Sequence, residues 1–371
     1  MDEKTLFNYS LLDCLIAQDS SFFMFRSPFK QTIELAIFKP GDVHSFLDVH
    51  SLNGKEGFVI TPFIPAENHP VILLSNPHIL TGETSIFRWL SSFEGTRGCR
   101  DNQSYMISND SFKAKATYRM AFNRLRNELK AGHCDKVVLS RMATIQKTAG
   151  FSIGKTFKSA CIAYPEAFVY LCHTPVSGTW LGSTPETLLS GHESTWQTVA
   201  LAGTKKRTEV SCYQDWDDKN KYEQRIVSSY IENIMKSSGF VYTKTEPVSV
   251  EAGELTHLKT TFDFQMIETS HLGDVLDQLY PTPAVCGFPK EKAKLLILEN
   301  EGYDRFYYGG FIGSLSVNGQ TELFVNIRCL SVGNDTLTLY AGGGLLPSSD
   351  VETEWEETEA KLRTMFSLID H

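Results

Sequence analysis

The chain has 371 residues, of which 42% are hydrophobic and 21% charged, and its formal net charge is −9. This composition is typical of a globular protein with a sizeable core, and the absence of a long basic run argues against a nucleic-acid partner. No stretch approaches the roughly 18 consecutive apolar residues that span a bilayer, and the first residues lack the basic-then-apolar order of a signal peptide. We therefore expect a cytoplasmic protein without a nucleic-acid or membrane partner.

The order of elements along the chain predicts an α+β fold. Residues 1–105 alternate short apolar runs with proline and Asn-Gly turns, which is typical of strands. Apolar residues recur at helical spacing over residues 113–131, and Gly132 predicts the end of that helix. Further helices are expected before Gly239 and at the C-terminus, with β-rich segments at residues 167–171, 323–330 and 336–341. Because strands outnumber helices and come in consecutive groups, we predict largely antiparallel sheets.

The eight cysteines are spread along the chain without a Cys-x-x-Cys pair and without a histidine at zinc spacing. This distribution predicts neither a disulfide framework nor a zinc cluster. We interpret the cysteines as reduced thiols that lie mostly in the core.

The C-terminal helix carries charged residues along one stripe. Glu354, Glu357 and Lys361 are spaced i, i+3 and i+7, beside an apolar stripe. The helix alone also fits a solvated face with a weak ion pair between Glu357 and Lys361. The preceding run Gly342–Gly344 predicts a glycine turn with amides open to an anion.

An ordered set of motifs resembles the chorismate-utilising enzymes and, within them, the isochorismate synthases. The motifs follow the family's order over residues 113–366: 136–141 (KVVLSR), 181–186 (LGSTPE), 201–204 (LAGT), 281–287 (PTPAVCG), 304–305 (DR), 308–313 (YGGFIG), 326–328 (NIR), 341–344 (AGGG) and 354–361 (EWEETEAK). The resemblance implies two stacked, mainly antiparallel sheets flanked by helices. It also implies a single domain over residues 1–371, with a chorismate-binding catalytic region at 113–366 and residues 1–105 as a strand-rich part of the same fold.

The resemblance assigns the two catalytic residues. Lys136 is expected to be the general base that activates a water molecule, and Glu186 the general acid that protonates the departing hydroxyl. The first role needs a neutral amine and the second a protonated carboxyl, so burial or neighbouring charges must favour these forms. Without the motifs, Lys136 would be interpreted as an exposed lysine at the end of a strand. Glu186 would be interpreted as a residue of a turn or of the start of a helix.

The resemblance also implies a Mg²⁺ site and a site for chorismate. Glu223 and Glu357 match the family's metal-binding glutamates, Glu354 matches a further carboxylate of that site, and Glu301 is a weaker candidate; such carboxylates suit an octahedral Mg²⁺. The expected substrate-binding residues are Gly203, Thr204, His257, Ala284, Arg328, Gly342 and Lys361. His257 also fits a hydrogen-bonded core histidine. The run at residues 205–207 (KKR) either draws in an anion or is a solvated loop.

Several positions depart from the family pattern or separate its members. The metal helix reads Tyr222-Glu223-Gln224, where many relatives have histidine after the glutamate. Asn220 stands where several relatives have an acidic residue, and Tyr280 where a histidine is common. Amine-adding relatives generally lack the lysine at Lys136, and the aminodeoxychorismate synthases among them commonly have a lysine where Ala202 stands here. The sequence therefore favours water as the nucleophile and no obligatory glutaminase subunit. Ala284, where salicylate-forming members tend to have threonine, favours isochorismate as the product. The alternative from another functional class is a protein that binds chorismate without catalysing a reaction.

Overall fold

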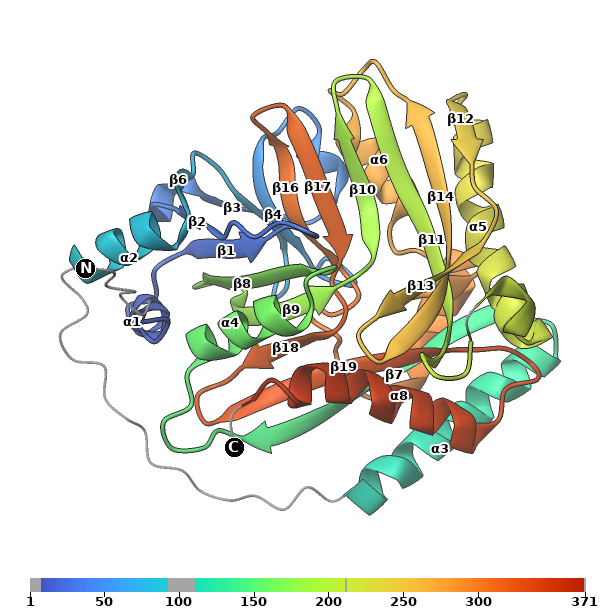
Figure 1. Ribbon diagram of the computed structural model, residues 1–371. Helices are drawn as coiled ribbons and strands as arrows, with labels where there is room; N and C mark the ends of the chain where they lie inside the picture. The colour runs from blue at the N-terminus through green and yellow to red at the C-terminus, as the bar shows by residue number, and fades with distance from the viewer. Residues whose placement is uncertain (1–7, 93–110, 211, 370–371) are drawn as a thin grey trace.

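The computed structural model describes residues 8–92, 111–210 and 212–369. In these residues two large sheets lie against each other, and helices cover their outer faces (Figure 1). Every strand pairing in both sheets is antiparallel. The predicted α+β class with two stacked antiparallel sheets is therefore confirmed.

The first sheet contains the strands that carry the lysine and glycine motifs. In spatial order its strands are β15 (Gly287–Phe288), β7 (Lys136–Gln146), β19 (Thr336–Leu345), β18 (Cys329–Val332), β9 (Gly178–Thr184), β8 (Phe168–Thr174), β1 (Phe22–Arg26), β2 (Glu34–Ile37) and β6 (His78–Thr81). Its central strands β1 and β8 are buried along their full length, because the second sheet covers one face and helices cover the other.

The second sheet carries the LAGT and histidine motifs. Its strands, in order, are β12 (Val241–Lys244), β14 (Leu255–Gln265), β11 (Thr195–Lys206), β10 (Thr187–His192), β17 (Gln320–Val325), β16 (Phe311–Val317), β4 (Gly57–Thr61), β5 (Val71–Leu74) and β3 (Val43–Phe46), with β13 (Val248–Ala252) also beside β14. The segment 323–330, predicted as one strand region, is divided between β17 and β18. The chain therefore passes from one sheet to the other at residues 326–328.

Eight α-helices are assigned in the described residues. They are α1 (Leu11–Ala17), α2 (Glu83–Ser92), α3 (Ser111–Lys130), α4 (Ile153–Ala163), α5 (Asp218–Ser237), α6 (Leu272–Leu279), α7 (Lys290–Asn300) and α8 (Val351–Phe366). The three predicted helices correspond to α3, α5 and α8. The short helices α1, α2, α4, α6 and α7 were not predicted. None of the helices in the described residues is long and apolar enough to cross a membrane.

Aromatic packing joins the two sheets. Phe168 on β8 stacks on Phe324 of β17, with ring centroids 4.2 Å apart and an interplanar angle of 6°. Phe23 of β1 packs against Phe58 of β4 in a tilted arrangement, with centroids 4.9 Å apart and an interplanar angle of 34°. Because offset aromatic pairs contribute about 0.5–1.5 kcal/mol each beyond their buried area, these rings fix one sheet relative to the other.

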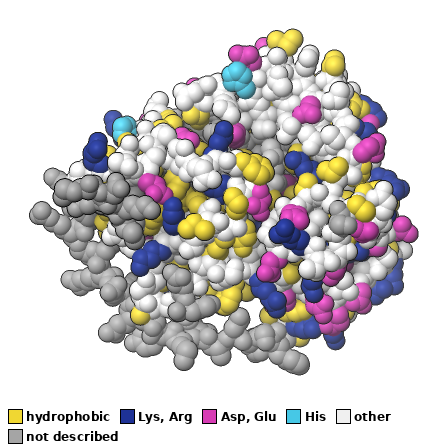
Figure 2. All heavy atoms as spheres, in the orientation of Figure 1, with side chains coloured by type: hydrophobic (Ala, Val, Ile, Leu, Met, Phe, Trp, Pro, Cys, Tyr) yellow, Lys and Arg dark blue, Asp and Glu magenta, His cyan; other side chains and the backbone are white. Residues whose placement is uncertain are grey.

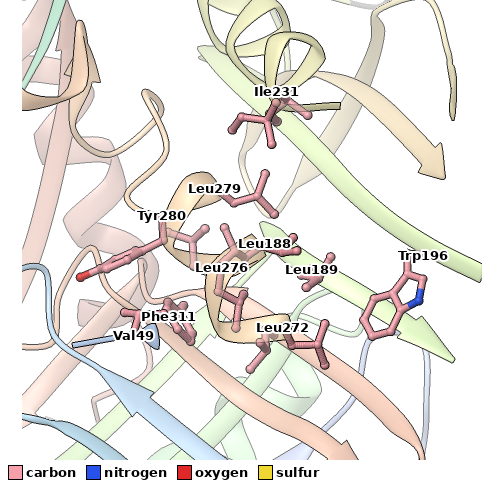
Figure 3. Packing of buried hydrophobic residues seen from close by; sticks show 14 of the residues in the cluster. Val49, Leu188, Leu189, Trp196, Ile231, Leu272, Leu276, Leu279, Tyr280 and Phe311 are labelled. Atoms are coloured by element: carbon pink, nitrogen blue, oxygen red, sulfur yellow. The ribbon is translucent and has the colours of Figure 1, made fainter. Parts of the chain in front are cut away.

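A second core lies between the second sheet and its helices. Figure 3 shows Leu276 and Leu279 of α6 turned toward Leu188 and Leu189 of β10, with Ile231 of α5 alongside. Fully burying such a side chain stabilises the fold by about 1.5–3 kcal/mol. This packing sets the position of α5, and α5 carries Glu223.

The glycine run is not the turn that the sequence predicted. Gly342, Gly343 and Gly344 lie within β19 and pair with residues 140, 139 and 138 of β7. None of the three has a positive φ. They matter because they lack a side chain: a Cβ on Gly344 would lie 2.2 Å from Oε1 of Glu223. The run therefore leaves room for carboxylates beside the strand.

The seven cysteines in the described residues are free, as expected.

Candidate active site

Lys136, the first residue of β7, is completely buried. Its Nζ lies 2.9 Å from Oε1 of Glu223 on α5. Helix α5 begins where the Asp217 side chain accepts a hydrogen bond from the amide of Asn220, and Glu223 lies on the side of this helix that faces β7 and β19. The structure thus joins the predicted base to a predicted metal ligand.

Glu186 lies between β9 and β10 and is also buried. Its Oε1 has no hydrogen-bond partner among the described residues. Burial raises the pKa of this carboxyl to about 8, although the nearby charges of Lys136 and Lys361 lower it. A carboxyl with this pKa is mostly protonated at pH 7, as a general acid requires.

One cavity brings together most of the predicted site. It encloses about 610 Å³, part of which is open to solvent. Nine of the predicted residues line it: Glu186, Gly203, Thr204, Glu223, His257, Ala284, Arg328, Gly342 and Lys361. Lys136 is not part of the lining, but its ion-pair partner Glu223 is, and so is Gly344, against which its side chain packs. Residues from both sheets and from α5 and α8 therefore converge on one space.

His257 and Arg328 form a hydrogen-bonded pair in this cavity. The Nη2 of Arg328 donates to Nε2 of His257 at 3.0 Å, so Nδ1 carries the ring proton and donates to the Gly203 carbonyl at 3.0 Å. Burial, together with the charges of Arg328 and Lys361, lowers the pKa of His257 to about 3. The histidine is therefore neutral and orients the guanidinium.

The backbone at Arg328 adopts an uncommon conformation. Its φ is +49°, in the left-handed region, which costs a residue with a side chain about 1–3 kcal/mol. The conformation occurs where the chain crosses between the sheets and directs the buried guanidinium toward the cavity. Such a cation can bind a carboxylate through two parallel hydrogen bonds.

Three glutamates gather beside the glycines of β19. A Cβ on Gly343 would lie 3.2 Å from Oε2 of Glu354 and 3.6 Å from Oε1 of Glu357, while Glu223 approaches Gly344. Glu354 and Glu357 belong to α8, which begins at its cap Asp350. The glycine run and two helices thus place all three predicted metal ligands beside β19.

Lysines already neutralise part of this glutamate cluster. Oε1 of Glu354 accepts hydrogen bonds from Lys219 and from the Ser349 hydroxyl, and Lys361 lies 2.6 Å from Oε1 of Glu357. Burial, together with the neighbouring Glu357, raises the pKa of Glu354 to about 7 despite Lys219. The pKa of Glu357 is instead lowered, because Lys361 and Lys219 outweigh the effect of burial.

The glutamate cluster offers the kind of donor atoms that a hard divalent cation prefers. Its ligands are carboxylate oxygens, and the buried Oε2 of Glu354 has no hydrogen-bond partner within the described chain. As the side chains stand, however, no three His, Cys, Asp or Glu residues of the described part are close enough to form a complete metal site. A cation would therefore have to replace lysine contacts with its own.

Glu301, the weaker metal candidate, has a different environment. Its carboxylate accepts hydrogen bonds from the amide and hydroxyl of Ser140 at 2.6 and 2.8 Å and from Nε and Nη2 of Arg305 at 2.7 and 2.5 Å. Arg305 also donates to the carbonyls of Val138 and Val285. This network ties β7 to the segment that carries Ala284, and both carboxylate oxygens of Glu301 accept hydrogen bonds within it.

Some residues of the site were not predicted. Lys219 lies one turn before Glu223 on α5 and forms an ion pair with Glu354; the i, i+4 spacing was the available signal. Tyr308 and Tyr340 line the cavity, and their rings stack with centroids 5.4 Å apart. Tyr308 is the first residue of the motif at 308–313 but carried no predicted role, and no local pattern marks Tyr340. The two rings meet only through the packing of β19 against the segment before β16.

Comparisons with known proteins identify the family of this chain. Residues 79–370 match the family described as chorismate binding enzyme. Isochorismate synthase EntC of Escherichia coli K12 is 27% identical over 282 residues, covering 73% of this chain and 72% of EntC. The vibriobactin-specific isochorismate synthase of Vibrio cholerae is 29% identical over 264 residues, covering 67% of this chain and 66% of the relative.

Solved structures show the same fold. The structure of MenF, the menaquinone-specific isochorismate synthase of Escherichia coli, superposes with a TM-score of 0.76 at 20% identity, covering 98% of this chain and 92% of MenF. Because the family match spans most of the chain and includes every residue that lines the cavity, the chain belongs to the chorismate-binding enzyme family.

Proposed function

We propose that this chain is an isochorismate synthase, an isomerase that depends on Mg²⁺ and adds water at C2 of chorismate while the C4 hydroxyl leaves. The relatives EntC and MenF carry this name. The single observation that carries the proposal is the buried pair of catalytic candidates: a lysine that contacts the glutamate cluster, and a carboxyl, Glu186, whose pKa of about 8 keeps it protonated.

The proposed reaction divides the proton transfers between these two groups. Lys136, as a neutral amine, takes a proton from water, and the water oxygen bonds to C2. The ring double bond shifts, the C4–oxygen bond breaks, and Glu186 donates the proton that turns the departing hydroxide into water. General acid–base catalysis of this kind contributes about 10²–10⁴-fold to a rate.

Binding and orientation fall to the other residues of the cavity. Arg328, oriented by His257, suits one carboxylate of the substrate. Glu223, Glu354 and Glu357 would hold Mg²⁺, which when bound would neutralise the other carboxylate and draw the charge of Glu223 away from Lys136. Gly203 and Thr204, at the bulge of β11, complete the wall of the cavity.

Two positions at which members of the family differ lie in the cavity. Ala202 and Ala284 both line it, so a substitution at either position would meet the substrate directly. Alanine at 202, instead of the lysine common in aminodeoxychorismate synthases, supports water as the nucleophile without a glutaminase subunit. Alanine at 284, instead of the threonine of salicylate-forming members, supports a reaction that stops at isochorismate.

The test is incubation of the purified chain with chorismate and Mg²⁺, followed by chromatography of the products. Isochorismate formed without ammonia supports the proposal. Pyruvate release would instead identify a salicylate-forming enzyme, and turnover that requires ammonia an amine-adding one. Chorismate binding without any turnover would indicate a silent binding protein.

A further inference from the structure

A second concave region lies outside the catalytic cavity. We call it the outer groove. It is lined by Tyr164, residues 206–208, residues 253–255 and, at the end of α8, Ala360, Arg363, Thr364, Phe366 and the following Ser367. It encloses about 1550 Å³, part of which is open to solvent. In Figure 1 the ends of β11 and β14 come down onto α8 at this place.

The outer groove and the catalytic cavity share their walls. Along β11 the chain runs from Thr204 in the cavity to Lys206 in the groove, and along β14 from His257 in the cavity to Leu255 in the groove. Helix α8 likewise contributes Lys361 to the cavity and its next turn to the groove. Three elements thus lead from the groove into the cavity.

A single layer of side chains separates the two spaces. Arg328 lines the cavity, and its Nη1 donates to the hydroxyl of Thr364, which lines the groove, at 3.2 Å. The Tyr164 hydroxyl donates to the carbonyl of Thr364 at 2.9 Å. Only the side chain of Thr364 would therefore separate an anion in the groove from Arg328, the residue expected to bind it.

The charge of the outer groove is opposite to that of the whole protein. Its lining includes three basic residues, Lys206, Arg207 and Arg363, and one acidic residue, Glu254. Arg207 pairs with Glu251 at 2.9 Å. In the described chain neither Lys206 nor Arg363 forms an ion pair, and both are exposed.

This basic patch occurs on a surface that is otherwise mixed. Figure 2 shows acidic and basic side chains interspersed over the same face, and the chain carries a net charge of −9. A dianionic substrate is therefore repelled by the protein as a whole, so its association depends on local positive charge.

We propose that the outer groove is an encounter site for the dicarboxylate substrate, where Lys206 and Arg363 collect the anion before it passes Thr364 into the cavity. The inference rests on the proposed function, since it takes chorismate as the ligand. The exposed ring of Phe366 and the buried Leu255 give the groove an apolar part for the carbon skeleton, and the two cations match the two carboxylates.

The test compares two double variants that remove the same charge. Lys206→Gln with Arg363→Gln removes the groove cations, and Arg124→Gln with Lys130→Gln removes two exposed cations of α3 that line neither space. Stopped-flow fluorescence with chorismate and Mg²⁺ measures the association rate constant at several KCl concentrations. Steady-state assays measure kcat.

The groove variant is expected to lower the association rate constant about tenfold at low ionic strength, with kcat unchanged. The loss should shrink as salt screens the charges, and the α3 variant should change little. Equal losses in both variants, or none in the groove variant, would overturn the encounter site. Failure of the proposed function would appear separately, as a wild-type chain that binds chorismate without converting it while the difference between the variants persists.

Discussion

Nζ of Lys136 lies 2.9 Å from Oε1 of Glu223, which joins the candidate base on β7 to a candidate metal ligand on α5. The lysine side chain is fully buried, and 10% of the glutamate side chain is exposed. The pair therefore links catalysis to stability, because removing either charge leaves the other one buried without its partner.

Replacing Lys136 with methionine should abolish turnover and also destabilise the protein. We expect kcat to fall at least about 100-fold, since the base is lost, and the free energy of unfolding to fall by about 3 kcal/mol, since Glu223 loses its partner. Chemical denaturation and a chorismate assay measure the two effects. The double variant with Glu223→Gln should regain stability but remain inactive; recovered activity would refute the role of Lys136.

Replacing Glu186 with glutamine should change how stability depends on pH. The pKa of Glu186 is raised by burial from 4.5 to about 8, so the folded state keeps a proton that the unfolded state loses. The stability that this proton contributes is full below pH 4.5 and is lost as the pH rises toward 8. The variant should therefore gain stability relative to wild type over this range, by about 1.4 kcal/mol per pH unit at most.

The same pKa predicts the alkaline limb of the rate profile. Turnover by the wild type should decline as Glu186 ionises near pH 8, and Glu186→Gln should be inactive at every pH because it has no proton to donate.

Thermal or chemical unfolding of wild type and Glu186→Gln over pH 4.5 to 8 measures the predicted difference in stability. Parallel stability curves for the two proteins would show that Glu186 titrates normally.

Replacing Lys219 with methionine should tighten the binding of Mg²⁺. Burial opposes the charge of Lys219, but the carboxylates of Glu354, Glu223 and Glu357 raise its pKa, so it remains an ammonium that competes for Glu354. We expect the dissociation constant for Mg²⁺ to fall about fivefold, equivalent to about 1 kcal/mol.

Titration calorimetry with MgCl₂ measures this effect without any turnover. Lys221→Met is the matched control, because Lys221 lies on the same helix but over the ring of Tyr213. Weaker binding in Lys219→Met would mean that the lysine supports the cation instead of competing with it.

Adding a methyl group at Gly344 should disrupt the ion pair between Lys136 and Glu223. A Cβ there would lie 2.2 Å from Oε1 of Glu223 and 2.7 Å from Cε of Lys136, while at Gly343 the nearest atom is 3.2 Å away. Gly344→Ala should cost about 1–3 kcal/mol of stability and most of the activity, and Gly343→Ala should cost less. Gly41→Ala, with no atom within 4 Å, is the control; equal effects at Gly344 and Gly41 would contradict the close packing.

The local sequence was sufficient to predict the main helices and the fold class. Apolar residues at helical spacing and a following glycine marked α3 and α5, whose ends at Lys130 and Ser237 precede Gly132 and Gly239. These signals are local, because hydrogen bonding and burial within a helix depend on residues a few positions apart. The short helix α6 has too few turns to show such a period clearly, and its position depends on packing against β10.

The sequence by itself determined the chemical types available for the site, and the ordered motifs indicated the candidate residues. Only the tertiary structure decided the partners of these residues: Glu301 with Arg305, Lys219 with Glu354, and Gly342–Gly344 as strand residues beside carboxylates instead of a turn. The reason is physical. A pKa shift, an ion pair or a close backbone approach depends on distance and burial, and these arise when β7, β19, α5 and α8 pack together from distant parts of the chain.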